Sequence, residues 1–220
     1  MSAFPAEAPR HCDLCPRLVT YREECAAAEP DWFNGAVPSF APEGGDEAVR
    51  LLIIGLAPGV TGANRTGRPF TGDWAGDLLY GSLLKHGLAT GTYDKRPDDG
   101  LALQGTMITN AVRCVPPANK PVGQEINNCR PFLSARIAAC PNLKTILCLG
   151  KISHDTTLRA FGERVAGKPF GHDTAYTIER DDGPVLLRSS YHCSRYNTST
   201  KRLTEEMFDD VIAQCAADIA

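Results

Sequence analysis

Four short apolar runs alternate along the chain with segments of helical periodicity. The runs span residues 51–57, 106–110, 144–150 and 185–190, and within each the apolar side chains are consecutive rather than alternating. Continuous apolar runs are typical of parallel strands that are buried on both faces. The pattern therefore predicts an α/β fold, a three-layer α/β/α sandwich with a central, mainly parallel four-stranded sheet.

Three segments between and after these runs have helical periodicity. Leucines form one stripe over residues 74–88, and apolar side chains recur at helical spacing over residues 124–139 and 203–219. We expect Pro131 to kink or divide the second of these helices, because proline lacks the N–H that an interior helical position uses. Residues 89–100 have no such periodicity and predict a solvated loop insertion.

Length and composition describe an ordinary globular protein. The chain has 220 residues, of which 43% are hydrophobic and 22% charged, and no linker is visible, so we expect one domain over residues 1–220. Its apolar runs are too short to span a bilayer, and the first residues lack the apolar core of a signal peptide. We therefore expect a cytoplasmic monomer without a membrane partner, associated with the nucleoid if the source is bacterial.

The charges are unevenly distributed although the net charge is only -3. Residues 51–72, 101–124 and 185–204 each contain basic side chains and no acid. Each of these segments includes a predicted strand and the loop that follows it, which is where ligands bind in parallel sheets. This arrangement indicates a face for a polyanion such as a nucleic acid, the alternative being chance clustering.

Nine cysteines are many for a reducing compartment. Cys12 and Cys15 form a CxxC pair, and Cys114 and Cys129 follow far along the chain. Zinc and a [4Fe–4S] cluster both accept four cysteine ligands, and the CxxC alone could also be a redox pair or an accident. The other five cysteines lie on apolar stripes or strands and predict core positions: Cys25, Cys140, Cys148, Cys193 and Cys215.

The glycine-rich segment 55–73, GLAPGVTGANRTGRPFTGD, matches neither a P-loop nor a dinucleotide-binding loop. Its glycines allow the backbone to approach a ligand closely, and Pro58 can stiffen the turn. Phe70 is expected either to pack at the entry of the next helix or to contact a ligand. Asp73 is expected either to cap that helix or to act in catalysis.

Three segments together resemble the motifs of the family 5 uracil-DNA glycosylases, the broad-specificity, iron–sulfur members of their superfamily. They are residues 55–73, residues 108–120 (ITNAVRCVPPANK) and residues 191–204 (YHCSRYNTSTKRLT). The resemblance extends from Cys12 to Thr204 and implies the superfamily's α/β/α fold, with the cysteine-bearing N-terminal segment folded onto the domain. It also implies hydrolysis of the N-glycosidic bond of uracil, and of hypoxanthine or xanthine, in double- and single-stranded DNA, leaving an abasic site.

The resemblance assigns ligands to a cofactor. It implies that Cys12, Cys15, Cys114 and Cys129 hold a structural [4Fe–4S] cluster, with zinc as the alternative if the site is not loaded with iron. The cluster would tie the N-terminal segment to the region between the last two cysteines.

The resemblance also gives roles to three polar residues. Asp73 would stabilise the oxocarbenium-like sugar or orient the attacking water, Asn110 would bind the pairing edge of the base, and His192 would donate a hydrogen bond to a base oxygen. Because a base inside a duplex is out of reach, the nucleotide would be flipped into a pocket and stacked on Phe70. The expected base-binding residues are Gly55, Ala57, Pro58, Gly59, Phe70, Asn110 and His192.

Two departures from the superfamily pattern affect these expectations. The stretch GLAPG lacks the acid that family 4 members have early in the first motif, so Asp73 is the only acid in its loop. Cys193 stands where many members have proline, which predicts a less rigid loop from which Arg195, Tyr196 or Asn197 could enter the duplex. The expected DNA contacts are Arg65, Arg68, Ser194, Arg195, Tyr196, Asn197, Lys201 and Arg202.

Other functions use the same features differently. A non-catalytic protein could bind damaged or single-stranded nucleic acid with a structural four-cysteine metal site, but the joint presence of Asp73, Asn110 and His192 favours an enzyme. A redox module would need a route for electrons and a partner, and no segment of the sequence indicates either. A strict uracil-only enzyme is the narrower enzymatic alternative.

Overall fold

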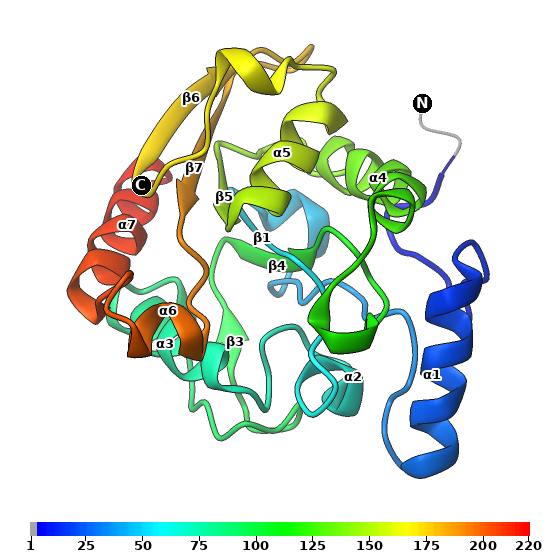
Figure 1. Cartoon of the computed structure of the whole chain (residues 1–220). Helices are drawn as coiled ribbons and strands as arrows, with labels where there is room; N and C mark the ends of the chain where they lie inside the picture. The colour runs from blue at the N-terminus through cyan, green and yellow to red at the C-terminus, as the bar shows by residue number, and fades with distance from the viewer. Residues whose placement is uncertain (1–3) are drawn as a thin grey trace.

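The computed structural model describes residues 4–220 and has a five-stranded sheet at its centre (Figure 1). The strand order is β4 (Thr106–Asn110), β1 (Leu51–Gly55), β5 (Thr145–Leu149), β7 (Val185–Ser190) and β6 (Thr174–Ile178). The first four strands are parallel, and β6 is antiparallel to β7. The predicted α/β class and mainly parallel sheet are confirmed, but the sheet has five strands rather than four.

Alternation along β1 explains the three layers. Leu51 and Ile53 belong to the core on one face of the sheet, which is covered by α3 (Trp74–Lys85) and α7 (Glu205–Asp218). Leu52 and Ile54 belong to the core on the other face, covered by α4 (Gly123–Ala138) and α5 (Lys151–Ala160). Because successive side chains of a strand point to opposite faces, one apolar run contributes to both cores.

The shorter elements surround this sandwich. Helix α1 (Pro16–Ala28) lies outside the three-layer sandwich (Figure 1). A bidentate ion pair from Arg17 to Glu125 joins it to α4. Figure 1 shows α2 and α6 at one end of the molecule. The remaining short elements are α2 (Ala63–Thr66), α6 (Arg195–Ser199), the 3-10 turns η1 (Gly45–Ala48), η2 (Pro117–Asn119) and η3 (Val165–Gly167), and the strands β2 (Ala89–Thr90) and β3 (Ala102–Leu103).

Two expectations about local structure are corrected in part. Pro131 lies inside one continuous helix, α4, and does not divide it. Residues 91–98 are irregular and mostly exposed, as predicted, but Ala89–Thr90 form β2, which pairs with β3, and the Asp99 side chain is buried against Arg68. No helix within residues 4–220 has the length and apolar character needed to cross a membrane.

Candidate active site

A cleft of about 470 Å³ lies beyond the carboxyl ends of β1 and β4, where three loops meet. The first loop follows β1, the second follows β4, and the third follows β7 and leads into α6. All three are the acid-free segments identified in the sequence. Of the predicted base-binding and catalytic residues, the cleft is lined by Ala57, Pro58, Gly59, Phe70, Asp73, Asn110 and His192.

Gly55 lies behind this lining rather than in it. It is the last residue of β1 and pairs with Asn110 at the end of β4. A Cβ on Gly55 would stand 2.4 Å from Asn110 Oδ1 and 2.7 Å from Phe70 Cζ, distances that real Cβ atoms do not adopt. The absence of a side chain at Gly55 therefore allows Asn110 and Phe70 to lie side by side at the base of the cleft.

The two carboxylate oxygens of Asp73 have different environments. Oδ1 accepts a hydrogen bond of 3.2 Å from Gly76 N, which makes Asp73 the N-cap of α3. Oδ2 lies beside the glycine loop, where a Cβ on Gly62 would come within 2.6 Å of it and a Cβ on Gly59 within 3.5 Å. Burial raises the pKa of Asp73, and hydrogen bonds from the backbone N–H groups of Gly76 and Ala75 oppose this shift. Capping and a role in the cleft are therefore compatible in one residue.

His192 is partly buried, and its imidazole is neutral at neutral pH. Its ring stacks on that of Phe70, with centroids 5.8 Å apart and planes inclined by 25°. Its Nδ1 is buried without a hydrogen-bond partner, and burial lowers the pKa of His192 to about 4. At neutral pH the ring therefore offers one N–H donor and one acceptor, which suits hydrogen bonding to a neutral base.

The loop that carries His192 is held by its own side chains. Asn197 Nδ2 donates to His192 O at 2.8 Å, and Ser194 caps α6 by accepting from Asn197 N at 3.5 Å. Two of the predicted DNA contacts, Ser194 and Asn197, are thus engaged within the loop. Arg195 and Tyr196 are exposed, with Tyr196 at 72% the most exposed of the large hydrophobic side chains in the described chain.

The remaining predicted DNA contacts differ in accessibility. Lys201 and Arg202 are exposed just after α6, although the Arg202 guanidinium stacks 4.6 Å from the centroid of Tyr191. Arg65 is half-buried and donates from Nε to Thr61 O. Arg68 is a correction, because its side chain is 6% exposed and forms a bidentate ion pair with Asp99. It is not available to DNA phosphates.

Sequence reasoning missed Trp74 and Asn119, which also line the cleft. Trp74 follows the cap residue, is 53% exposed, and donates from Nε1 to Thr198 Oγ1 at 3.2 Å. The Arg195 guanidinium lies 5.6 Å from its ring. The signal for Trp74 was a large aromatic residue directly after Asp73. Asn119 has a φ of 56°, which the sequence did not predict.

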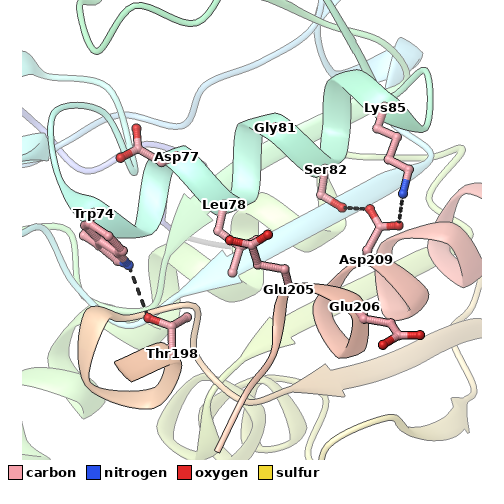
Figure 2. A pocket seen from close by; sticks show the side chains of 10 residues that line it. All are labelled: Trp74, Asp77, Leu78, Gly81, Ser82, Lys85, Thr198, Glu205, Glu206 and Asp209. Carbon is pink, nitrogen blue, oxygen red and sulfur yellow. Dashed lines mark hydrogen bonds and ion pairs between the residues drawn. The ribbon is translucent and has the colours of Figure 1, made fainter. Parts of the chain in front are cut away.

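A second cleft, of about 550 Å³, lies between α3 and the helices α6 and α7 (Figure 2). Figure 2 shows Asp77, Glu205, Glu206 and Asp209 around it, and Asp209 is paired with Ser82 and Lys85. Four carboxylates oppose a polyanion at this surface. The smaller cleft, which joins polar side chains to acid-free loops, is therefore the candidate for nucleic-acid chemistry.

The four cysteines of the predicted metal site line a third, small cavity. Hydrogen-bond donors reach three of the sulfurs: Arg22 to Cys114 Sγ at 3.3 Å, Arg113 N to Cys129 Sγ at 3.3 Å, and Asn128 Nδ2 to Cys15 Sγ at 3.6 Å. In the described part of the chain, no group of three or more His, Cys, Asp or Glu side chains is arranged to hold a metal ion. The four thiols thus surround a cavity without converging on one ion position. The other five cysteines are buried, as predicted.

Comparison with known proteins gives one consistent result. Residues 42–216 match the model of the uracil DNA glycosylase superfamily. A type-5 uracil-DNA glycosylase of Thermus thermophilus is 42% identical over 209 residues, covering 92% of this chain and 91% of the relative. A type-5 enzyme of Pyrobaculum aerophilum is 34% identical, covering 94% and 89%. A type-4 uracil-DNA glycosylase of Archaeoglobus fulgidus is 30% identical over 70% of each chain.

Proposed function

Because the chain belongs to the type-5 uracil-DNA glycosylases of the uracil DNA glycosylase superfamily, we propose that it excises several deaminated bases from DNA. The reaction of this enzyme class is hydrolysis of the N-glycosyl bond of uracil in DNA, and the chain is a hydrolase of that kind. Hypoxanthine and xanthine are the further substrates that we propose. The observation that carries the proposal is the joint placement of Asp73, Asn110 and His192 around one cleft.

Base recognition follows from the walls of the cleft. A nucleotide flipped out of the duplex would place its base against Phe70, and base–aromatic stacking contributes ~1–3 kcal/mol per base. The Asn110 amide offers a donor and an acceptor to the pairing edge of the base. His192 donates from its neutral ring to a base oxygen, which gains negative charge as the glycosidic bond breaks. These three side chains bind and orient the base.

Asp73 acts on the sugar side of the bond. As the base leaves, the sugar acquires oxocarbenium character, which a carboxylate stabilises by its charge. Oδ1 is held by the end of α3, whereas Oδ2 is left beside the glycine loop, where it can also accept a proton from an attacking water. The single acid in this loop is therefore the group that we assign to charge stabilisation and water orientation.

DNA binding would occur on the surface formed by α6 and the residues after it. Arg195, Lys201 and Arg202 supply positive charge, and no acid lies between Val185 and Thr204. Tyr196 is exposed next to Arg195, which lines the cleft, and it is the side chain that we assign to the space left by the flipped base. Contacts of the three basic side chains with DNA phosphates would add affinity without sequence preference.

Breadth of specificity is supported by the size of the cleft. Its volume of about 470 Å³ lies within the range of ~300–1,000 Å³ that is usual for ligands larger than a single pyrimidine. The experiment is base release from duplex and single-stranded oligonucleotides that carry one uracil or one hypoxanthine. We expect release of both bases, with uracil faster. Release of uracil alone would indicate the strict enzyme, and DNA binding without release would indicate a binding protein.

We further propose that Cys12, Cys15, Cys114 and Cys129 hold a [4Fe–4S] cluster. Four thiols that surround one cavity, with N–H donors directed at three of the sulfurs, supply the ligand set that such a cluster needs. When bound, the cluster would supply a structural cross-link and no step of the hydrolysis. It would join the N-terminal segment and α1 to the loop after β4. Asn110 is the last residue of β4 and directly precedes this loop.

Replacement of Cys129 tests this assignment. We expect Cys129→Ser to lower the iron and sulfide content of the purified protein to a small fraction and to lower its melting temperature. Cys25→Ala is the matched control, because Cys25 is buried in α1 but does not line the cavity. Equal iron content in both variants would contradict the ligand assignment. Stoichiometric zinc in the wild-type protein would show that the site holds a single zinc ion instead of a cluster.

A further inference from the structure

Residues 68–73, which carry both Phe70 and Asp73, adopt a backbone that needs support. Phe70 has a φ of 55°, in the left-handed region that a bulky L-residue rarely adopts, and Gly72 has a φ of 91°. Such a conformation persists only when its surroundings determine it. Phe70 and Asp73 therefore depend on neighbouring side chains that hold this segment in place.

Two tyrosines, the buried Tyr80 and the partly buried Tyr93, bind the backbone of this segment. Tyr80 Oη donates to Pro69 O at 2.5 Å, and Tyr93 Oη donates to Phe70 O at 3.2 Å. Tyr93 Oη also accepts from Gly72 N at 3.4 Å, so one hydroxyl bridges the two sides of the turn. Burial raises the pKa of Tyr93 to about 12, which keeps this hydroxyl protonated and able to donate.

Arg68 holds the same two rings from behind. Its guanidinium lies 5.6 Å from the centroid of Tyr80 and 5.9 Å from that of Tyr93, within the range of cation–π contacts. Its Nε donates to Thr71 Oγ1 at 2.7 Å, and its two terminal nitrogens donate to Asp99 at 2.9 and 2.7 Å. Asp99 is fully buried and also accepts from Leu101 N and Asp94 N.

The first turn of α3 closes this assembly. A Cβ on Gly76 would stand 1.9 Å from Phe70 O and 2.3 Å from Tyr93 Oη. Helix α3, whose N-cap is Asp73, therefore lies directly against the carbonyl that Tyr93 binds. A displacement of Tyr93 or of the turn would move Phe70 and the carboxylate together.

We infer that Tyr80, Tyr93 and Arg68 are positioning residues that hold Phe70 and Asp73 in their reactive arrangement, with the 89–100 segment as their support through Asp99. This inference rests on the proposed function of Phe70 and Asp73. It gives the insertion between α3 and β4 a role in the reaction, although the segment itself does not line the cleft. None of the three residues lines the cleft.

Tyr93→Phe is the sharpest test, because it removes one hydroxyl and keeps the ring. We expect the single-turnover rate of uracil release at saturating enzyme to fall by about 10- to 100-fold, since small displacements of reacting groups have effects of that size. The dissociation constant for the same duplex without uracil should stay within about twofold, because α6 and its basic residues are untouched. The affinity for free uracil should fall, because Phe70 is displaced.

Tyr176→Phe is the matched control. Tyr176 Oη donates to Pro169 O at 2.8 Å on β6, so the variant loses a similar hydroxyl–carbonyl bond away from the cleft. We expect Tyr176→Phe to release uracil at the wild-type rate and to have its melting temperature lowered about as much as that of Tyr93→Phe. A Tyr93→Phe enzyme with wild-type rate and uracil affinity would overturn the inference, as would equal slowing of both variants. If wild type released no uracil, the proposed function would fail, and the free-uracil affinities would still test the positioning role.

Discussion

Asp73→Asn is expected to slow uracil release by about two orders of magnitude or more, because a charge that stabilises the transition state in a buried site is lost. Asparagine keeps an oxygen acceptor and is as good an N-cap as aspartate, so α3 should remain intact. The variant therefore separates the carboxylate's charge from its capping hydrogen bond to Gly76. Single-turnover release and melting temperature, measured side by side, check both statements.

Asp77→Asn is the matched control for this variant. Asp77 lies one helical turn further along α3, where it is exposed and paired with Lys95. The substitution removes the same charge from the same helix end but away from the candidate active site. We expect it to keep the wild-type rate. If Asp73→Asn also kept that rate, Asp73 would be only a helix cap, and the search for the chemistry would move to His192 and Asn110.

The pH dependence of the rate has a definite sign. The active form of Asp73 is the carboxylate, and burial raises its pKa, so the rate should fall as the pH drops through this raised value. His192 has a pKa lowered by burial to about 4 and stays neutral above it, so its titration should not change the rate near neutral pH. The residual activity of Asp73→Asn should lack the part of the acidic limb that Asp73 causes. A fall that persists near pH 4 in this variant would belong to His192.

Gly55→Ala is expected to reduce excision of uracil and hypoxanthine by about 10²-fold, the effect of moving reacting or orienting groups by roughly 1 Å. The new Cβ would stand 2.4 Å from Asn110 Oδ1 and 2.7 Å from Phe70 Cζ, so at least one of these base contacts must shift. Neither neighbour can turn aside easily, because Asn110 at the end of β4 and Phe70 are both buried. Release rates on both substrates check this.

Gly81→Ala is the control for the glycine substitution. Gly81 lies within α3, and a Cβ there would meet no atom within 4 Å. Alanine is the better helix former by roughly 0.5–1 kcal/mol, so this variant should be at least as stable as wild type and fully active. Full activity of Gly55→Ala would show that the base does not enter between Asn110 and Phe70.

The sequence predicted the buried parallel strands because their apolar side chains are consecutive rather than spaced at helical periodicity. β4 and β7 have the predicted bounds, whereas β6 was missed. The sequence of β6, TAYTI, places exposed and less exposed residues in alternation on an edge strand, and it has no continuous apolar run. Helix α5 was missed for a related reason. Its buried face includes His154, Thr156 and Thr157, which satisfy their polar groups by hydrogen bonds rather than by apolar contacts.

Most residues that line the candidate site could be predicted from the sequence, whereas the residues that hold them in place could not. Acid-free loops after strands pointed to one edge of the sheet, and the cleft lies there. Arg68 was assigned to DNA because an arginine in a basic loop is usually exposed. Its burial depends on Asp99, which lies 31 residues away in a segment that looked like a solvated loop. A partner so distant along the chain leaves no periodic signal, so local patterns could not reveal the network behind Phe70.

The contact between Trp74 and Thr198 limits how this enzyme can be altered. Asp73 and Trp74 are consecutive, so the carboxylate and the indole that meets α6 belong to one helix end. Substitutions that displace Trp74 will therefore also shift Asp73, and we expect them to change turnover and DNA retention together. Engineering for weaker product retention is therefore better directed at Lys201 and Arg202, which lie beyond α6 and outside this turn.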